Sequence, residues 1–359
     1  MQKKYPFIST FTRLGEFLAQ FPEGTRSSAP GMDELNREYF DEFSSLLETE
    51  HIYNPWFTPE SIQRALLGIS MMLTEEVLHR WCHENGISGK PQESMKTIGL
   101  VLAGNIPLVG FHDLLCVLAA GHKVLAKPSS KDERLIQKVA ELLGSIDPAM
   151  GGRIEFNPEK LKGMNAVIAT GSDNSARYFE YYFRDMPHII RKNRNGIAVL
   201  TGKETKDDLA GIGDDIFSYF GMGCRNVTKI FIPQDYDLKV LLGVLDSYHP
   251  LCQHHKYSNN LAYYRTMYLM NQVPLLDNEV LLLKEDHSIA SPVGVVFYER
   301  YSEIGWVQEQ LRIHSEEIQC VVSLHPDIEG ALQPGTTQEP MPWDYADGVD
   351  TISFLKEEI

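Results

Sequence analysis

Between residues 97 and 183 the chain alternates short apolar runs with longer amphipathic stretches. The short runs, residues 98–102, 124–126 and 166–169, are almost entirely apolar, as buried parallel strands are. Each is followed by a stretch with apolar residues at helical spacing, namely residues 111–120, 133–143 and 176–183. This alternation predicts a parallel sheet covered by helices on both faces, an architecture common among nucleotide-binding proteins.

The N-terminal part, residues 1 to about 90, is predicted to be helical. Thr58, Pro59 and Glu60 form a typical helix start, with a capping residue, a proline at the first helical position and an acid in the first turn. Apolar residues at helical spacing follow, and residues 71–82 continue the pattern. Because no recognisable site chemistry occurs there, this segment is predicted to be scaffold.

A second helical pattern, residues 209–220, ends at two glycines, Gly221 and Gly223, and Cys224 follows them directly. An apolar, β-rich run begins at Val227, so Cys224 is predicted to lie on a tight connection. The glycines allow a close approach, so that a substrate carbonyl could reach the sulfur. Arg225 adds positive charge beside the thiol, which favours thiolate. The alternative is a small buried residue before a strand, and a second feature elsewhere must decide between them.

The length and the charge of the chain limit the classes of protein to which it can belong. With 359 residues, two substantial lobes are expected. The net charge of -16, from 49 acidic and 33 basic residues, opposes binding to phosphate backbones and predicts no nucleic-acid partner. The longest apolar stretch, residues 97–111, is too short to span a bilayer, and the amino end has no continuous apolar signal core. A soluble, cytoplasmic protein is therefore expected.

The five cysteines are odd in number and widely spaced, which argues against a disulfide framework. Four residues could be taken for metal ligands: His249, Cys252, His254 and His255. Adjacent histidines point in different directions on a regular element, and no second ligand pair stands at a matching spacing. No metal is expected.

Three connections follow predicted strands, at residues 104–111, 122–132 and 169–179. They leave the carboxyl ends of strands, where open α/β sheets bind ligands, and a helix start such as Ser172 suits a pyrophosphate. The dinucleotide fingerprint Gly-x-Gly-x-x-Gly and the phosphate-binding P-loop are both absent from the sequence. Taken singly, Asn105 also fits a turn residue, Lys127 a surface charge, and Gly171 with Ser172 a plain helix cap.

Taken together, the motifs resemble a known superfamily. The order Gly-Asn-x-Pro, Lys-Pro-Ser, Thr-Gly-Ser and Gly-x-Gly-Cys is similar to that of the aldehyde dehydrogenase superfamily. Residues 254–269, 276–286, 291–301 and 343–355 resemble more closely the fatty acyl-CoA reductases of the bacterial-luminescence type. The resemblance implies an aldehyde dehydrogenase-like α/β fold, with two lobes built on parallel sheets, a helical N-terminal region and a C-terminal oligomerisation strand.

The resemblance also assigns two catalytic roles. Cys224 falls on the family nucleophile, and Asn105 falls on the asparagine whose side-chain amide helps to hold the oxyanion. Loss of one such donor typically costs about 3 kcal/mol of transition-state stabilisation.

Six residues fall on cofactor-binding positions of the family: Lys127, Ser129, Ser130, Thr170, Gly171 and Ser172. Lys127 falls on the lysine that contacts the adenosine ribose, and Gly171 with Ser172 on the pair that meets the pyrophosphate. Ser130 falls where many NAD-preferring relatives carry a glutamate that binds the ribose hydroxyls. Because a 2′-phosphate would meet no negative charge there, NADPH is the expected cofactor, with NADH as the alternative.

One departure from the family bears on the reaction. Hydrolytic aldehyde dehydrogenases carry a Glu-Leu-Gly-Gly stretch whose glutamate activates water, and the comparable region here, residues 188–196, contains no carboxylate. Without that base an acyl-enzyme persists until a thiol or a hydride reaches it, which favours thioester reduction. Asp185 and Glu204 lie near this region in sequence and remain alternative bases.

The predicted organisation is a cofactor lobe of residues 1–200, a catalytic lobe of residues 201–325 and a tail of residues 326–359 that contains a strand at 350–354. The predicted activity is NADPH-dependent reduction of a fatty acyl-CoA or acyl thioester to the aldehyde. The alternatives are a CoA-acylating aldehyde dehydrogenase, an acyl-phosphate reductase that forms a semialdehyde, and an acyl-carrying scaffold without chemistry. The expected partners are an acyl-CoA substrate, an acyl-transferring synthetase-type protein and further copies of this chain.

Overall fold

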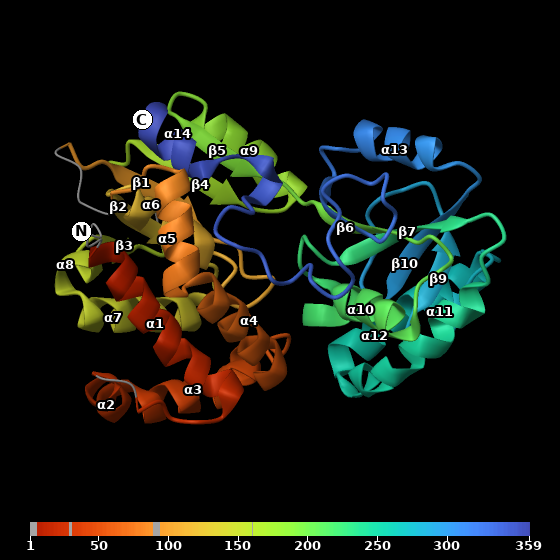
Figure 1. The fold of residues 1–359 in the computed structure, drawn as a ribbon, viewed down its shortest axis with the longest axis horizontal. Helices are drawn as coiled ribbons and strands as arrows, with labels where there is room; N and C mark the ends of the chain where they lie inside the picture. The colour runs from red at the N-terminus through yellow and green to blue at the C-terminus, as the bar shows by residue number, and fades with distance from the viewer. Residues whose placement is uncertain (1–5, 29–30, 89–93, 160) are drawn as a thin grey trace. The chain divides into compact units, whose positions relative to one another are not determined.

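The computed structural model describes residues 6–28, 31–88, 94–159 and 161–359 (Figure 1). The chain forms two compact units, Met1–Lys192 with Pro340–Ile359, and Asn193–Glu339, called here the first and the second unit. The predicted lobes had borders at residues 200 and 325 instead. The cofactor-binding and catalytic roles given to those lobes stay predictions.

The first unit contains a five-stranded sheet and most of the helices. Its strands are β1 (Thr97–Val101), β2 (Lys123–Lys127), β3 (Ile154–Phe156), β4 (Ala166–Thr170) and β5 (His188–Arg191). Its helices are α1 (Pro6–Glu23), α2 (Met32–Leu35), α3 (Asp41–Tyr53), α4 (Pro59–Met72), α5 (Glu75–Glu84), α6 (Phe111–Ala119), α7 (Glu133–Ile146), α8 (Pro148–Gly151), α9 (Asp173–Phe183) and α14 (Thr351–Glu357). The sheet has the order β3-β2-β1-β4-β5, and all its strand pairs are parallel.

The strands and helices predicted between residues 97 and 183 are confirmed. β1, β2 and β4 cover the three apolar runs, and α6, α7 and α9 cover the helical stretches that follow them. The start of α4 is also confirmed, since the Thr58 side chain accepts a hydrogen bond from the Ser61 N–H and Pro59 is the first helical residue. The short edge strands β3 and β5 were not predicted, because their sequences, IEF and HIIR, include charged or polar residues and are not continuous apolar runs.

The N-terminal helices and the sheet share one core. Phe7, Phe11 and Leu14 of α1, Trp81 of α5 and Phe111 of α6 are all fully or almost fully buried in it. Figure 1 shows α1, α4 and α5 side by side, and contacts between each pair of them agree with this view. The segment predicted to be scaffold therefore forms part of the same core as the sheet.

The second unit contains a six-stranded sheet of order β11-β6-β7-β10-β9-β8. Its strands are β6 (Asn195–Val199), β7 (Val227–Pro233), β8 (Leu276–Asp277), β9 (Leu282–Glu285), β10 (Val295–Tyr301) and β11 (Ile318–Ser323). Its helices are α10 (Lys206–Phe217), α11 (Leu238–Leu245), α12 (His255–Met270) and α13 (Ile304–Ile313). All pairs are parallel except that of β8 with β9, so the sheet is parallel apart from one short edge strand.

The predicted C-terminal strand at residues 350–354 is wrong, because this segment begins helix α14. The Asp350 side chain accepts a hydrogen bond from the Ser353 N–H and so caps the helix start. Ile352 and Leu355, three residues apart, are both buried, and α14 contacts α6 (Figure 1). The chain returns to the first unit at Pro340, and α14 lies near the end of this returning segment.

In the part of the chain that the structure describes, no helix is both long enough and apolar enough to cross a bilayer.

Candidate functional site

The predicted cofactor residues lie at one edge of the first sheet. Val101 of β1 is in register with Lys127 of β2 on one side and with Ala169 of β4 on the other, so the carboxyl ends of these strands are level. From β1 the chain continues to β2 and β3 on one side, and β4 and β5 occupy the other side. The boundary between β1 and β4 is therefore a topological switch point, where open α/β sheets bind ligands.

The segment after β1, residues 102–110, carries Asn105 and is called here the Asn105 loop. Asn105 is half-buried. A Cβ atom at Gly104 would come within 2.5 Å of the Ser129 Oγ, so only glycine lets the loops after β1 and β2 meet this closely. Leu108 has a φ of 57°, which is costly for a branched non-glycine residue.

A buried acid holds the Asn105 loop in this conformation. The Asp132 carboxylate accepts a hydrogen bond of 2.7 Å from the Leu108 N–H, and Asp132 is 3% exposed. Burial raises the pKa of Asp132 well above its ordinary value, and the nearby Glu50 raises it further, while the Leu108 N–H lowers it. Sequence analysis did not select Asp132. Its place directly before α7 suggests an ordinary helix cap, but its side chain caps nothing there.

Lys127 ends β2 and Ser130 follows it, at the carboxyl end of the strand. Lys127 is the last residue of β2, is half-buried, and donates a hydrogen bond of 3.2 Å to the Glu159 carbonyl. An ammonium group has three donors, so this bond leaves capacity for ribose hydroxyls. Ser130 is exposed, and Ser129 accepts a hydrogen bond of 3.3 Å from the Lys131 N–H.

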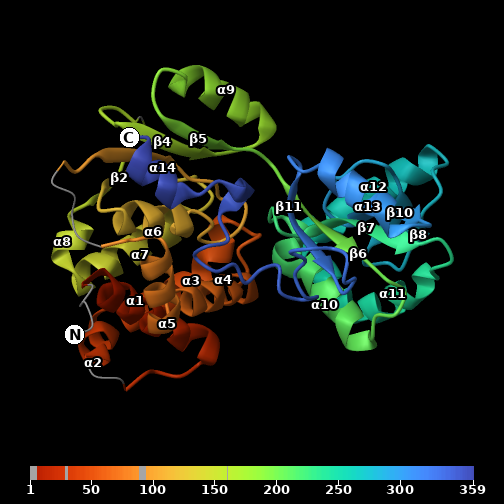
Figure 2. The same cartoon turned by 45° about the horizontal axis from the view of Figure 1, so that its top comes forward.

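Thr170, Gly171 and Ser172 connect β4 with α9, as predicted. The exposed Ser172 is the N-cap of α9 and accepts a hydrogen bond of 3.4 Å from the Ser175 N–H. A Cβ atom at Gly171 would lie 2.8 Å from the Ser175 Cβ and 2.9 Å from the Phe179 ring, so glycine is needed for the backbone to pass this close to the helix. Figure 2 shows α9 alongside β4 and β5. The exposed amide end of α9 suits a phosphate group.

Cys224 lies on a β-turn of the second unit, which confirms that it is on a tight connection. The turn, residues 223–226, is called here the cysteine turn. It is closed by a hydrogen bond of 3.1 Å from the Asn226 N–H to the Gly223 carbonyl. Asn226 also accepts a bond of 2.7 Å from the Gly223 N–H through its side-chain Oδ1. Cys224 is half-buried, and Cys320 of β11 donates through its Sγ to the Arg225 carbonyl at 3.7 Å.

The backbone before the cysteine turn is strained. Tyr219, Phe220 and Gly221 have φ values of 51°, 59° and 75°, and the left-handed conformation costs a non-glycine residue about 1–2 kcal/mol. Packing compensates, because the buried Phe220 ring lies 4.4 Å from the His254 ring and 6.1 Å from the Tyr257 ring. Strain that the surroundings enforce in this way is common at functional sites.

Three of the other four cysteines are poor candidates for the nucleophile. Burial raises the pKa of Cys82 to about 12 and that of Cys116 well above its ordinary value. Burial also raises the pKa of Cys252. Since the thiolate is the reactive form, these thiols are disfavoured relative to a thiol of ordinary pKa.

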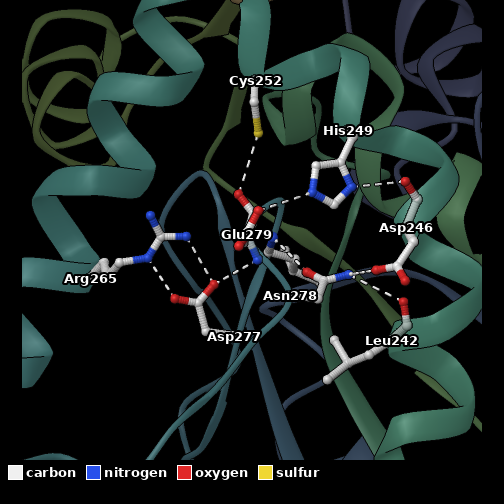
Figure 3. Close-up of polar contacts among 9 residues, drawn as sticks. Leu242, Asp246, His249, Cys252, Arg265, Asp277, Asn278 and Glu279 are labelled. Atoms are coloured by element: carbon white, nitrogen blue, oxygen red, sulfur yellow. Dashed lines mark hydrogen bonds and ion pairs between the residues drawn. The ribbon is translucent and has the colours of Figure 1, made fainter.

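Two of the residues first considered as metal ligands, His249 and Cys252, have other partners (Figure 3). His249 Nδ1 lies 2.9 Å from the Asp246 carbonyl, and its Nε2 lies 3.6 Å from the Glu279 carboxylate. Cys252 donates to the Glu279 carbonyl at 3.4 Å. His254 caps the start of α12 through its side chain. Among the described residues, no group of three His, Cys, Asp or Glu side chains is arranged to hold a metal ion.

The two acids named as alternative bases also have definite positions. Glu204 accepts hydrogen bonds from the N–H groups of Thr201 and Gly202, at 2.6 and 3.0 Å, and so stabilises the loop after β6. Asp185 lies in the first unit and is 90% exposed, with Arg184 at 3.6 Å. Glu204 also accepts a hydrogen bond of 2.8 Å from the Thr201 hydroxyl, so three bonds hold it to its own loop.

A small cavity of about 20 Å³ lies beneath the segment that precedes the cysteine turn. It is lined by Phe217, Phe220, Gly221, Tyr257 and Val295, among others. A cavity of this size has room for a single water-sized group.

The structure groups the predicted site residues in two sets. Asn105 and the six cofactor candidates lie in the first unit, at the carboxyl edge of its sheet, and Cys224 lies in the second unit. Sequence analysis missed Asp132 and Asn226, which hold the two catalytic candidates in place. The signal for Asn226 was a polar side chain directly before the apolar strand β7.

The fold is similar to that of known aldehyde dehydrogenases. An oxidoreductase from Marinobacter aquaeolei matches with a TM-score of 0.62 and 13% identity, over 92% of this chain and 75% of its own. An indole-3-acetaldehyde dehydrogenase complexed with NAD+ matches with a TM-score of 0.61 and 14% identity, over 91% of this chain and 73% of its own. An aldehyde dehydrogenase from Bacillus cereus, also an NAD+ complex, matches with a TM-score of 0.60 and 12% identity, over 90% and 72%.

These similarities confirm the predicted aldehyde dehydrogenase-like α/β fold. No family model matches the sequence, and no curated protein matches it.

Proposed function

We propose that this protein is an NADPH-dependent reductase of acyl-CoA or another acyl thioester, with a fatty acyl group, and that it forms the aldehyde through an S-acyl intermediate on Cys224. The observation that carries the proposal is the half-buried Cys224 on a tight turn before β7, in a chain with an aldehyde dehydrogenase-like fold. We also propose, on the sequence motifs alone, that the chain is related to the luminescence-type reductases in particular.

The residues at the carboxyl edge of the first sheet fit a dinucleotide. Gly104 and Gly171 keep the backbone open where a Cβ atom would clash, and Ser172 at the start of α9 is exposed. Lys127 would contact the adenosine ribose, and Gly171 with Ser172 would meet the pyrophosphate. Two of the similar structures are NAD+ complexes, which supports a nicotinamide cofactor. The exposed Ser130 is neutral, which supports NADPH.

The protein groups act on the acyl carbonyl. The Cys224 sulfur attacks the carbonyl carbon, while the Asn105 amide and a backbone N–H near Cys224 stabilise the oxyanion. The carbon–sulfur bond to CoA breaks, the CoA thiolate leaves, and the acyl group stays on Cys224. NADPH, when bound, would supply a hydride to the acyl carbon. The Cys224 sulfur then leaves as the thiolate, and the aldehyde is released.

The sequence departure at residues 188–196 favours reduction over hydrolysis. No carboxylate stands in that region, and Glu204 is bonded to the backbone of its own loop. An S-acyl enzyme without a base to activate water is expected to wait for a hydride or a thiol.

Three other activities are alternatives, and the experiment described below distinguishes them. A CoA-acylating aldehyde dehydrogenase would run the same steps in reverse, and an acyl-phosphate reductase would start from a mixed anhydride. An acyl carrier would form the S-acyl group without any need for NADPH.

The proposal is tested by NADPH oxidation, followed by absorbance, with acyl-CoAs of increasing chain length. Wild type and Cys224→Ala are compared, and aldehyde is detected separately. Oxidation by wild type alone, with aldehyde formed, is the expected result. Equal rates in the two proteins, or no oxidation with any thioester, would remove Cys224 from this role. Acyl phosphates and the reverse reaction, with aldehyde, CoA and NADP+, then separate the alternatives.

The partners are also proposals. We propose that the protein forms a homo-oligomer and receives acyl groups either from CoA or from an acyl-transferring protein. Three tyrosines on one face of α9, Tyr178, Tyr181 and Tyr182, are 64–71% exposed, and aromatic side chains of this kind are common in interfaces. Light scattering at micromolar concentration should give a mass above that of one 40.7 kDa chain.

A further inference from the structure

We infer that Asn226 is the positioning residue of the nucleophile, and that its side-chain amide ties the cysteine turn to the carboxyl end of α10. This inference rests on the proposed function only in that it treats Cys224 as the reacting group. Asn226 is 0% exposed, so each hydrogen bond of its side chain is made inside the protein.

The side chain of Asn226 has bonds in two directions. Its Oδ1 accepts the Gly223 N–H at 2.7 Å, which holds the residue before Cys224. Its Nδ2 donates to the carbonyls of Ser218, Asp215 and Ile216 at 2.9, 3.0 and 3.3 Å. Since an amide nitrogen has two hydrogens, the longest of these bonds shares a hydrogen with another.

The carbonyls of Asp215 and Ile216 belong to the last turn of α10. The last four carbonyls of a helix have no partner within the helix, and they form its negative end. Asn226, the last residue of the cysteine turn, thus caps α10. Ser218 caps the same helix end separately, through a hydrogen bond of 2.6 Å from its Oγ to the Asp214 carbonyl.

The helix end is itself held in place. The buried Asp215 carboxylate accepts hydrogen bonds from the Gly335 N–H at 2.8 Å, the Thr337 N–H at 3.0 Å and the Thr337 hydroxyl at 2.8 Å. The turn is also fixed from the other side, because the Gly196 N–H donates to the Asn226 carbonyl at 2.8 Å. Asn226 therefore connects Cys224 to a rigid part of the second unit.

The chemistry of the contacts requires an amide. An aspartate has nearly the same shape and could still accept the Gly223 N–H, but it cannot donate to the three carbonyls. Its negative charge would also lie against the negative end of α10 and two residues from Cys224, where it would disfavour the thiolate.

The test measures alkylation of Cys224 by iodoacetamide from pH 6 to 10 in wild type, Asn226→Asp and Ser218→Ala, with mass spectrometry to identify the modified cysteine. Each protein is studied below its own unfolding midpoint. We expect alkylation of Cys224 to be at least tenfold slower in Asn226→Asp, with its pH midpoint moved upward. Ser218→Ala removes the other cap of the same helix end and should keep the wild-type rate and midpoint.

Wild-type rates and midpoint in folded Asn226→Asp would overturn the inference. An equal loss in Ser218→Ala would also overturn it, because any weakened cap would then have the same effect. If Asn226→Asp does not fold, amide exchange in wild type decides. The Gly223 N–H should exchange at least a hundredfold more slowly than in an unstructured peptide, and exchange at the peptide rate would contradict the bond to Asn226.

Alkylation requires neither cofactor nor thioester, so the result is separable from the proposed function. If wild type reduces no thioester but the variants differ in alkylation as expected, the proposed reaction fails and the role of Asn226 stands. If wild type is active and Asn226→Asp is alkylated at the wild-type rate, the proposed reaction stands and the role of Asn226 fails. In an active enzyme, Asn226→Asp should lower kcat at least tenfold and leave the KM for NADPH within twofold.

Discussion

The two sets of site residues are held in different ways. At the carboxyl edge of the first sheet, Ser130 and Ser172 are exposed, Lys127 is half-buried, and glycines keep the backbone open. The cysteine turn of the second unit is bonded through the fully buried Asn226 to the end of a helix. The first arrangement leaves donors and backbone accessible, whereas the second fixes one side chain in one position.

The difference matches what each proposed role requires. A dinucleotide is bound by many weak contacts along its length, so open loops at the ends of strands are sufficient. A nucleophile must be placed within a fraction of an ångström, and small displacements reduce the rate strongly. Asn105 is intermediate, because it lies on a loop of the open region but that loop is held by the buried Asp132.

The largest effect is expected for Asn105→Ala. If Asn105 donates to the oxyanion, its loss should lower kcat for thioester reduction about 10²- to 10³-fold, or about 2.7–4 kcal/mol. Steady-state kinetics with NADPH and an acyl-CoA measure this, and thermal unfolding controls for stability. An unchanged kcat would place Asn105 among the plain turn residues and leave the first unit with cofactor binding alone.

The next largest effect is a loss of stability on substitution of two glycines, one in each region. A Cβ atom at Gly196 would lie 2.5 Å from the Arg225 carbonyl oxygen and 2.8 Å from that of Asn226, so the turn itself would have to move. At Gly104 the Cβ atom would meet the Ser129 Oγ, which can rotate away, and the Ser129 Cβ at 2.7 Å, so the partly exposed loop that carries Ser129 would have to shift slightly. Gly196→Ala should therefore destabilise by about 3 kcal/mol and Gly104→Ala by about 1 kcal/mol.

Urea unfolding of both glycine variants gives the two free energies directly. Equal losses would mean that the loops of the first unit are packed as rigidly as the cysteine turn, which would remove the contrast between the two regions.

A smaller effect is expected at Ser130. Ser130→Glu places a negative charge where the 2′-phosphate of NADPH is proposed to lie, at an exposed position where charge repulsion is weakened by water. We expect the KM for NADPH to rise about tenfold, or about 1.4 kcal/mol, and that for NADH to stay level or fall. Ser130→Gln is the neutral control of the same size. Equal changes in Ser130→Glu and Ser130→Gln would argue against a phosphate contact.

A change of another kind, in stability with pH, is expected at Asp132. The pKa of Asp132 is raised by burial above its ordinary value of 3.8. Its contribution to stability is therefore complete below pH 3.8 and is lost as the pH rises toward the raised pKa. Asp132→Asn cannot ionise, so its stability relative to wild type should increase with pH, by at most about 1.4 kcal/mol per pH unit.

Urea unfolding at pH 5 and pH 8 measures the change at Asp132. Asp208→Asn is the flat control, because hydrogen bonds from Thr205 lower the pKa of Asp208. The stability that this group contributes is complete above its ordinary pKa of 3.8, so the difference between this variant and wild type should be the same at pH 5 and at pH 8. A flat difference for Asp132→Asn would mean that its carboxyl is not desolvated.

Local patterns in the sequence were sufficient for much of the fold. Apolar runs of three to five residues predicted β1, β2 and β4, because buried parallel strands need apolar side chains on both faces. Two glycines before Cys224 predicted its tight connection, since glycine allows the sharp change of direction there. The order of the motifs along the chain indicated the aldehyde dehydrogenase-like fold, which the structure shares.

Only the tertiary structure decided the rest, because the partners concerned lie far apart in the sequence. Asp132 bonds to the N–H of Leu108, Asn226 bonds to the end of α10, and α14 packs against α6. A sequence shows the donors and acceptors that each residue offers, but burial and distance decide which of them meet, and both are set when the whole chain has folded.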